Sequence, residues 1–263
     1  MKKRLMLYLL LLATAIVIMY FIWKSIPRSV VRDYPEIADE GILRIVTDYN
    51  SVGYYVMDDT IQGTQYDLCK AIEKLSGLSV EIHLENSLDQ CIAGLEALRY
   101  DVIARNIPIT MQTKAMISFT DPIHSGKQVL VQRAAAYNNG IQPIHNQINL
   151  AQKTLYVPEN SPSILRIRNL SEEIADTIYI QEVKQYNSEQ LIYMVAHGDI
   201  DYAVVDEAIA LHNQKNFPQI DVNTAISFTQ LQAWAVRKNV PILLDSLNCW
   251  LRQCQQLKKS KNL

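Results

Sequence analysis

Residues 100–122 read Tyr-Asp-Val-Ile-Ala-Arg-Asn-Ile-Pro-Ile-Thr-Met-Gln-Thr-Lys-Ala-Met-Ile-Ser-Phe-Thr-Asp-Pro. The apolar run at 102–104 is typical of a buried parallel strand. This run gives way to Pro108, which we expect to end the strand, and to Thr110, whose hydroxyl suits a turn or a helix cap. In open α/β sheets, ligands bind where the strands run out into loops at their carboxyl ends. We therefore expect a binding site at the end of this strand.

The segments on both sides of this strand alternate between strand and helix patterns. Before it, the pattern predicts strands at 43–47 and 80–84 and helices at 66–75, ended by Gly77, and at 87–99. After it, the pattern predicts strands at 127–132, 154–157, 178–180, 202–205 and 231–236, and helices at 161–169, 188–197, 207–214 and from 241 onward. Such alternation gives right-handed crossovers and parallel sheets. Two series of this kind predict an α/β protein with two lobes and a cleft between them.

Several motifs resemble those of the bacterial extracellular solute-binding proteins, which capture amino acids for transporters. Residues 100–122 partly match the pattern Thr-x-x-Arg followed by Phe-[Ser/Thr]-Asp-Pro, residues 63–68 a helix start, and residues 198–207 a segment of the second lobe. The resemblance extends from Gly41 to about Trp250. It implies a two-lobe periplasmic-binding-protein-like (type II) fold, with lobe 1 at 29–124 plus 227–263 and lobe 2 at 125–226.

A narrower resemblance concerns the solute-binding-like regulatory module of the membrane-bound lytic transglycosylase F family. It is carried by residues 46–51, 155–158, 168–174, 220–224 and 233–238. In that family a lysozyme-like catalytic domain follows the module. Because this chain ends at Leu263, directly after the last predicted helix, we expect no such domain and no catalysis. Nucleophile-elbow, phosphate-loop, dinucleotide and metalloprotease motifs are also absent from the sequence.

In the solute-binding family, the arginine of Thr-x-x-Arg holds the α-carboxylate of the ligand through a bidentate fork. Here Thr110 keeps the threonine, but Thr113 stands where the arginine belongs. Pro108 removes a second donor from the same place, because proline has no N–H. Arg105 is a substitute cation if the strand end directs it into the cleft; the alternative is an ion-paired surface residue.

The remaining site residues follow from the same resemblance. Asp206 matches the ligand of the α-ammonium group, although its position equally suits an N-cap. Ser161, followed by Pro162, is expected to cap a helix, with ligand binding as a second role. We expect Thr113 and Asp206 to face one cleft. The candidate ligand-binding residues are Asp48, Tyr49, Tyr54, Arg105, Asn106, Thr110, Ser161 and Asp206.

The N-terminal 28 residues resemble a membrane anchor and linker. Basic residues at 2–4 precede an uncharged run from Leu5 to Trp23, and a helix of that length is ~28 Å long, close to the ~30 Å hydrocarbon core. A cleavable signal peptide is the alternative, since 13–15 has the small-x-small form. Cleavage there would expose an apolar new terminus, so we expect an uncleaved anchor that places the rest of the chain in the periplasm.

Charge and cysteine content exclude several classes of partner. The five basic residues of the first 28 leave 20 lysines and arginines against 27 acidic residues, a net charge of −7. An acidic exterior disfavours nucleic acid. The cysteines and histidines lack metal-ligand spacing, and we expect no cofactor. A Cys69–Cys91 disulfide is open on the oxidising side of a membrane, but buried free thiols are the simpler interpretation.

Together these features predict an inner-membrane, periplasm-facing module that senses or captures an amino acid or a muropeptide-like ligand by lobe closure. A cell-wall lytic transglycosylase that the module regulates is the expected partner. Two alternatives stay open: a degenerate, non-binding copy that acts as a protein-interaction scaffold, and an amino-acid receptor for a transporter subunit.

Overall fold

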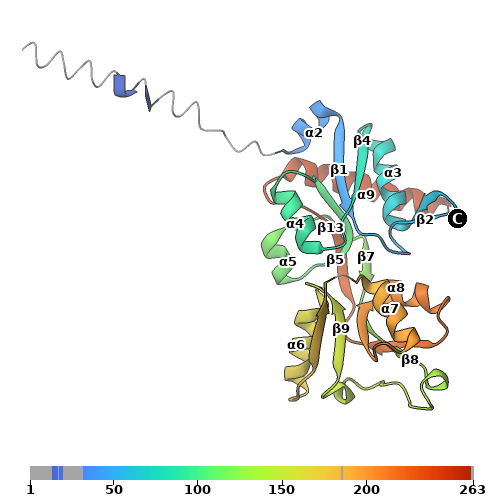
Figure 1. The fold of residues 1–263 in the computed structure, drawn as a ribbon. Helices are drawn as coiled ribbons and strands as arrows, with labels where there is room; N and C mark the ends of the chain where they lie inside the picture. Colours follow the sequence, from blue (N-terminus) through green and yellow to red (C-terminus); the bar gives the residue numbers. More distant parts are fainter. Residues whose placement is uncertain (1–13, 17, 20–31, 185, 262–263) are drawn as a thin grey trace, which may run out of the picture. The chain divides into compact units, whose positions relative to one another are not determined.

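The computed structural model describes residues 14–16, 18–19, 32–184 and 186–261 and forms two compact units, Met1–Arg32 and Asp33–Leu263. Most of the predicted membrane anchor lies outside the described residues. None of the helices in the described part combines the length and the apolar character needed to span a membrane. The unit Asp33–Leu263 contains two large sheets, each covered by helices (Figure 1), and a small two-stranded sheet.

The first sheet forms lobe 1 and contains most of the N-terminal half together with the end of the chain. Its strand order is β4-β1-β5-β13-β6, with β7 also paired to β13. β4 and β5 run parallel to β1, whereas β13 runs antiparallel to β5. The strands are β1 (Ile42–Thr47), β4 (Ser79–Leu84), β5 (Val102–Pro108), β6 (Ser118–Phe119), β7 (His124–Gly126) and β13 (Gln230–Val236).

Alternation of side chains along these strands builds one core on each face of the sheet. Ile45 and Trp234 belong to a cluster with α2, α3 and α9, while their neighbours Val46 and Ala235 belong to a cluster with α4. Asp33 Oδ1 accepts the backbone N–H of both Tyr34 (2.8 Å) and Leu243 (2.7 Å), near the starts of α2 and α9. The helices of lobe 1 are α2 (Tyr34–Glu40), α3 (Thr64–Ser76), α4 (Leu88–Glu96), α5 (Met111–Met116) and α9 (Pro241–Lys261).

The second sheet forms lobe 2 and has the order β10-β9-β11-β8-β12. One core packs its strands against α7 and α8, and the other packs them against α6. Its strands are β8 (Gln128–Arg133), β9 (Thr154–Pro158), β10 (Tyr179–Val183), β11 (Ala203–Asp206) and β12 (Ile220–Ala225). Its helices are α6 (Ser163–Glu173), α7 (Ser188–His197) and α8 (Glu207–Gln214), with short 3-10 turns η1 (Ala135–Tyr137) and η2 (Gln147–Leu150).

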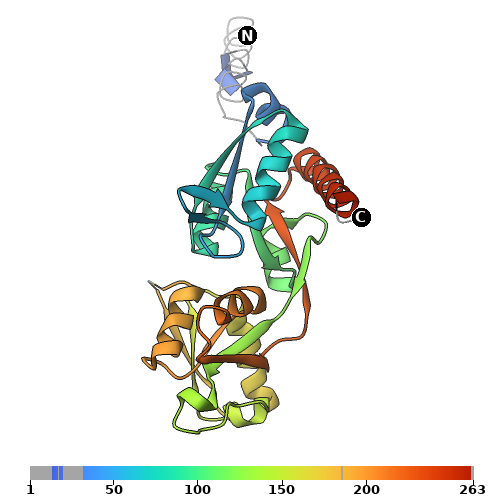
Figure 2. The same ribbon diagram turned by 90° about the vertical axis from the view of Figure 1, so that its right-hand side faces the viewer.

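The chain passes between the two sheets twice, as Figure 2 shows in the green and orange-red strands. β7 pairs in the first sheet and β8 in the second, and the return leads from β12 to β13. The lobe boundaries at 124 and 226 stay a prediction, which this sheet membership supports. In the described residues, Cys69 and Cys91 are free thiols, and both are buried.

Three local features differ from the pattern of the sequence. β5 extends past the predicted run at 102–104 and ends at Pro108, where proline is tolerated because it is the last residue of the strand. α4 ends at Glu96 rather than 99, since Leu98 has a left-handed backbone (φ 59°). The hairpin β2 (Tyr55–Met57) and β3 (Thr60–Gln62) was not predicted at all, and its turn residues Asp58 and Asp59 both have positive φ.

Candidate functional site: a cavity at the strand ends of both lobes

A cavity of about 310 Å³ lies where strands of both sheets reach their carboxyl ends. In lobe 1 its wall includes Asp48, directly after β1, and Arg105 and Pro108 on β5. In lobe 2 it includes Glu159, directly after β9, and Asp206 at the end of β11. This is the edge at which α/β sheets place ligands, and the volume lies at the lower end of the range for small-molecule pockets.

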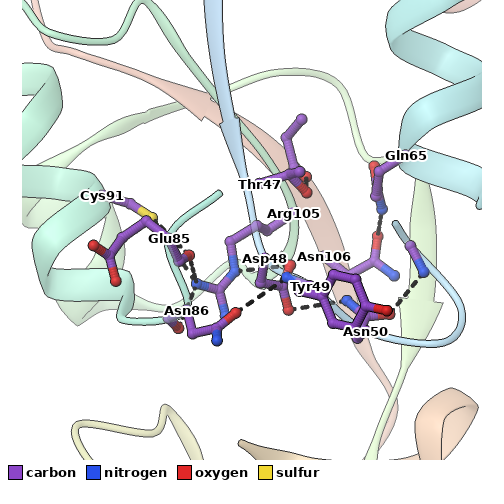
Figure 3. Close-up of polar contacts among 12 residues, drawn as sticks. Thr47, Asp48, Tyr49, Asn50, Gln65, Glu85, Asn86, Cys91, Arg105 and Asn106 are labelled. Atoms are coloured by element: carbon purple, nitrogen blue, oxygen red, sulfur yellow. Dashed lines mark hydrogen bonds and ion pairs between the residues drawn. The ribbon is translucent and has the colours of Figure 1, made fainter. Parts of the chain in front are cut away.

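Arg105 is held on the lobe 1 wall by three oxygen atoms of the same lobe. Its Nε lies 3.2 Å from Asp48 Oδ1, and its Nη1 donates to the carbonyl oxygens of Asn86 (2.9 Å) and Glu85 (3.5 Å). Figure 3 shows the guanidinium between Asp48 and the Glu85–Asn86 segment. The carboxylate and the guanidinium are each only about one-fifth exposed (20% and 19%). None of the described residues accepts a hydrogen bond from Nη2 of Arg105, so this nitrogen is its remaining donor.

A chain of side-chain hydrogen bonds orients Asn106 from the core. The indole N–H of Trp234, which can only donate, reaches Gln65 Oε1 at 2.7 Å. Gln65 is therefore fixed with Nε2 outward, and this group donates to Asn106 Oδ1 at 2.9 Å. The amide nitrogen of Asn106 is left as its free donor on the cavity wall (Figure 3). The orientation of this amide is thus set by a tryptophan that is itself fully buried.

The loop after β1 links the two lobes. Asn50 holds it in shape, because Asn50 Oδ1 accepts the N–H of Val52 (3.0 Å) and Gly53 (2.7 Å). The backbone N–H of Ser51 donates to Glu189 Oε1 on α7 at 2.6 Å, and Asn213 Nδ2 on α8 donates to the Ser51 hydroxyl at 3.3 Å. Ser51 is thus a direct bridge from lobe 1 to lobe 2 beside the cavity.

Asp206 has one of the two roles that the sequence suggested, the N-cap, and it lies on the cavity wall, as the predicted ligand-binding role requires. It is the N-cap of α8, with its Oδ1 accepting from the N–H of Ala208 at 3.0 Å, and it lies on the cavity wall. Its Oδ2 accepts from Gln232 Nε2 at 3.1 Å. Burial raises the pKa of the Asp206 carboxyl, and the two hydrogen bonds and His124 offset only part of this effect. The protein's own groups therefore compensate the ionised form of Asp206 incompletely.

Ser161 lies on the cavity, but its helix role differs from the prediction. The N-cap of α6 is Pro162 and the helix starts at Ser163, one residue later than an N-cap at Ser161 requires. The Ser161 hydroxyl still accepts from the N–H of Ser163, at 3.3 Å, and lies 2.8 Å from its hydroxyl. Pro162 itself has helical dihedrals, as a proline in the first turn of a helix does.

Six of the eight candidate residues line the cavity: Asp48, Tyr49, Arg105, Asn106, Ser161 and Asp206. Tyr54 does not, because its ring is buried and packs edge-on against Tyr66, at 5.8 Å between centroids. Thr110 is the N-cap of α5, and its hydroxyl accepts from the N–H of Thr113 at 3.1 Å. Neither residue belongs to the cavity wall.

The expectation that Thr113 faces the same cleft as Asp206 is wrong. Thr113 is buried, and its hydroxyl donates to the carbonyl oxygen of Pro108 at 3.0 Å. The Thr113 hydroxyl thus bonds within the first turn of α5 and to the end of β5. Pro108 itself lines the cavity and offers it no N–H.

Several wall residues were missed by sequence reasoning, among them Glu85, Asn86, Glu159, Lys184 and Glu189. Glu85, Glu159 and Lys184 each stand directly after a strand. Applying the rule of carboxyl strand ends to the predicted strand at 80–84 would have found Glu85. The predicted strands at 154–157 and 178–180 end too early to point directly to Glu159 and Lys184. Glu189 lies in the first turn of α7, and no sequence signal points from there to the facing lobe.

The sequence of this chain is similar to those of membrane-bound lytic murein transglycosylases F. That of Desulfosudis oleivorans is 31% identical over 215 residues, which are 81% of this chain and 45% of the relative. That of Aeromonas salmonicida is 27% identical over 203 residues, 77% of this chain and 40% of the relative. The chain thus spans less than half the length of these relatives, whose N-terminal module is the solute-binding-like domain. The resemblance to that module is confirmed.

Solved structures share the two-lobe fold. An ancestral arginine-binding protein bound to arginine superposes with a TM-score of 0.71 at 24% identity, covering 82% of this chain and 93% of that one. Holo ArgBP from T. maritima gives a TM-score of 0.73, also at 24% identity, covering 84% and 94%. At this identity the likeness shows the fold, and it confirms the predicted periplasmic-binding-protein-like architecture. The model of the bacterial extracellular solute-binding proteins, family 3, matches residues 43–263, and the chain belongs to that family.

Proposed function

We propose that this chain is a membrane-anchored, periplasm-facing solute-binding module that captures a small amino-acid-like or muropeptide-like ligand and responds by lobe closure. The observation that carries the proposal is the cavity at the carboxyl strand ends of both sheets, with polar wall residues from each lobe. A ligand that contacts both walls binds the closed arrangement better than the open one, so it shifts the population toward closure.

The proposed ligand contacts are the candidate residues on the wall. Asn106 offers an oriented N–H and Arg105 a single free Nη2, both from lobe 1. Ser161 and Asp206 offer a hydroxyl and a carboxylate from lobe 2, and Tyr49 offers a half-exposed ring. Tyr54 and Thr110 support the site from behind, Tyr54 through the Asn50–Tyr54 bridge of the loop and Thr110 through the cap of α5.

The output of the module is proposed to be regulation of a cell-wall lytic enzyme. The relatives named as lytic transglycosylases support this, because the part of them that the chain covers is the binding module. An anchor at residues 5–23 would hold the module beside the inner membrane, where such a partner acts. The module itself has no catalytic role in this proposal.

Two alternatives compete with regulation of a lytic enzyme. A receptor role for a transporter is supported by the likeness to an amino acid ABC transporter substrate-binding protein from Streptococcus pneumoniae, with a TM-score of 0.72 at 18% identity. A scaffold role without a ligand is favoured by the inward turn of Thr113 and by the pairing of Arg105 with Asp48. Both remove donors from the place where the family holds a carboxylate.

The test is a binding and compaction experiment on the full chain in detergent. Isothermal titration with the common amino acids and with peptidoglycan stem peptides should give saturable heat for at least one of them, and small-angle scattering should show a smaller radius of gyration with that ligand. Absence of heat across the panel would sink the proposal. Capture of a transglycosylase or a transporter subunit by the ligand-free chain would then favour the scaffold role.

A further inference from the structure

The lobe 1 wall lacks an ordinary carboxylate site. The hydroxyls of Thr110 and Thr113 are used in the first turn of α5 and on the carbonyl oxygen of Pro108. Pro108 lines the cavity without an N–H. A free carboxylate is normally held by two or three aligned donors, and these donors are missing at this place.

Arg105 does not make up for this loss. Its Nε and Nη1 are used within lobe 1, and Asp48 lies 3.2 Å from Nε, so the guanidinium charge is already balanced. A ligand carboxylate at Nη2 would lie near the Asp48 carboxylate as well, and like charges that share one cation repel each other. The single free N–H of Nη2 suits a neutral oxygen better than a carboxylate.

The cavity wall carries more acidic than basic residues. Five acidic residues line the cavity, Asp48, Glu85, Glu159, Glu189 and Asp206, against two basic ones, Arg105 and Lys184. Both basic side chains are engaged in ion pairs, Arg105 with Asp48 and Lys184 with Glu159 at 3.4 Å. Within the described part of the chain, no lysine or arginine pairs with Glu189 or Asp206, which lie on the lobe 2 wall.

Two further features favour a positively charged guest. Burial raises the pKa of Asp206, and a bound ammonium or guanidinium group would offset the free-energy cost of its ionised form. Tyr49 from lobe 1 and Tyr186 from lobe 2 both line the cavity with partly exposed rings (39% and 41%). Tyrosine faces attract cations, so the rings on the two walls suit the same charge.

We propose that the cavity selects a small amine with net positive charge, and that its recognition does not require a free carboxylate. This inference rests on the proposed function, because it assumes that the cavity binds a solute at all. Ammonium or guanidinium groups are held by Asp206 and Glu189 and by the tyrosine faces, and Arg105 and Asn106 donate to neutral oxygen atoms.

Matched pairs of compounds that differ only in the carboxylate test the proposal directly. The full chain in detergent is titrated with L-arginine and agmatine, with L-lysine and cadaverine, and with L-glutamine and L-glutamate as neutral and anionic probes. Agmatine and cadaverine are expected to bind at least as tightly as their amino-acid counterparts, and glutamate at least tenfold more weakly than either. Binding that is tenfold tighter for arginine than for agmatine, or tighter for glutamine than for both amines, overturns the inference and leaves the proposed function intact. If none of the six compounds and none of the wider panel binds, both fail together.

Variants of the lobe 2 carboxylates separate charge recognition from folding. Asp206→Asn keeps an oxygen for the cap of α8, and Glu189→Gln keeps one for Ser51. Each is expected to lower the affinity for agmatine at least tenfold. Asp201→Asn removes an exposed carboxylate of the same lobe that does not line the cavity, and it should leave the affinity unchanged. Unchanged affinity in both the Asp206 and the Glu189 variants overturns the proposal.

Discussion

The two walls of the cavity are built on different principles. On the lobe 1 wall, the polar groups bind mainly to one another: Arg105 to Asp48, Gln65 to Asn106, and Asn50 to its own loop. On the lobe 2 wall, Glu189 and Asp206 have hydrogen-bond donors but no lysine or arginine partner among the described residues. Lobe 1 is therefore a pre-arranged surface, whereas lobe 2 carries carboxylates that a bound cation can neutralise.

The largest expected effect contrasts one ion pair in each lobe. Arg237 Nη2 lies 2.8 Å from Asp101 Oδ1 in lobe 1, and Arg133 Nη2 lies 2.7 Å from Asp201 Oδ1 in lobe 2. Asp101 is fully buried, but the Asp201 side chain is 70% exposed. Asp101→Asn should lower the free energy of unfolding by about 3 kcal/mol, because it removes the carboxylate of a buried ion pair. Asp201→Asn should cost at most about 1 kcal/mol. Urea denaturation measures both, and equal losses would contradict a difference based on burial.

The second effect tests the pre-arranged character of lobe 1. Gln65→Met removes the acceptor of the Trp234 indole N–H and the donor to Asn106 Oδ1, so both of these groups lose their hydrogen bond. The expected loss is about 1–3 kcal/mol, the range for leaving buried polar groups unpaired. The same denaturation experiment measures it. Gln62→Met, on the partly exposed hairpin, is the control, and a loss as large there would speak against the relay.

A third, smaller effect concerns the bridge between the walls. Glu189→Ala removes the acceptor of the Ser51 N–H and should destabilise the closed arrangement by about 1 kcal/mol, the typical net value of one hydrogen bond. Small-angle scattering on the ligand-free chain should show a larger mean radius of gyration. Glu172→Ala, at an exposed position on α6, is the matched control. A variant at Glu189 with unchanged scattering would show that Ser51 does not hold the lobes together.

The smallest effect is a pH dependence of stability on the lobe 2 wall. Burial raises the pKa of Asp206 in the folded protein above its ordinary value of 3.8. The folded state therefore binds a proton more readily than the unfolded state, and ionisation at neutral pH costs stability. Asp206→Asn should unfold at slightly higher urea concentration than the parent at pH 7 without ligand. This gain should shrink as the pH falls through the raised pKa toward 3.8, and a gain that grows on acidification would reverse the sign of the argument.

Much of the fold could be predicted from the sequence because its elements are strongly periodic. The helices α7 and α8 have the predicted bounds, 188–197 and 207–214, since caps and apolar spacing agree there. The hairpin β2–β3 escaped prediction because Val56, Met57 and Ile61 are exposed, so no buried face produces an alternating pattern. Secondary structure on the surface leaves little trace in hydrophobic periodicity.

The candidate site was predictable where it follows from strand ends and unpredictable where it depends on side-chain direction. Asp48, Arg105 and Asp206 follow directly from the carboxyl-end rule. Thr113 could not be placed, because a threonine in the first turn of a helix satisfies its own backbone as readily as a ligand. The relay begins with a hydrogen bond between Trp234 and Gln65, which are 169 positions apart, and local spacing does not reveal such a contact.

Asp33 caps the starts of α2 and α9 with one carboxylate oxygen, and both helices pack into the same core of lobe 1. The chain leaves lobe 1 once to form lobe 2 and returns to lobe 1 once. In the proposed closure, lobe 2 moves while α2 and α9 stay tied to one core of lobe 1. We therefore expect a partner that responds to the proposed closure to contact lobe 2 itself.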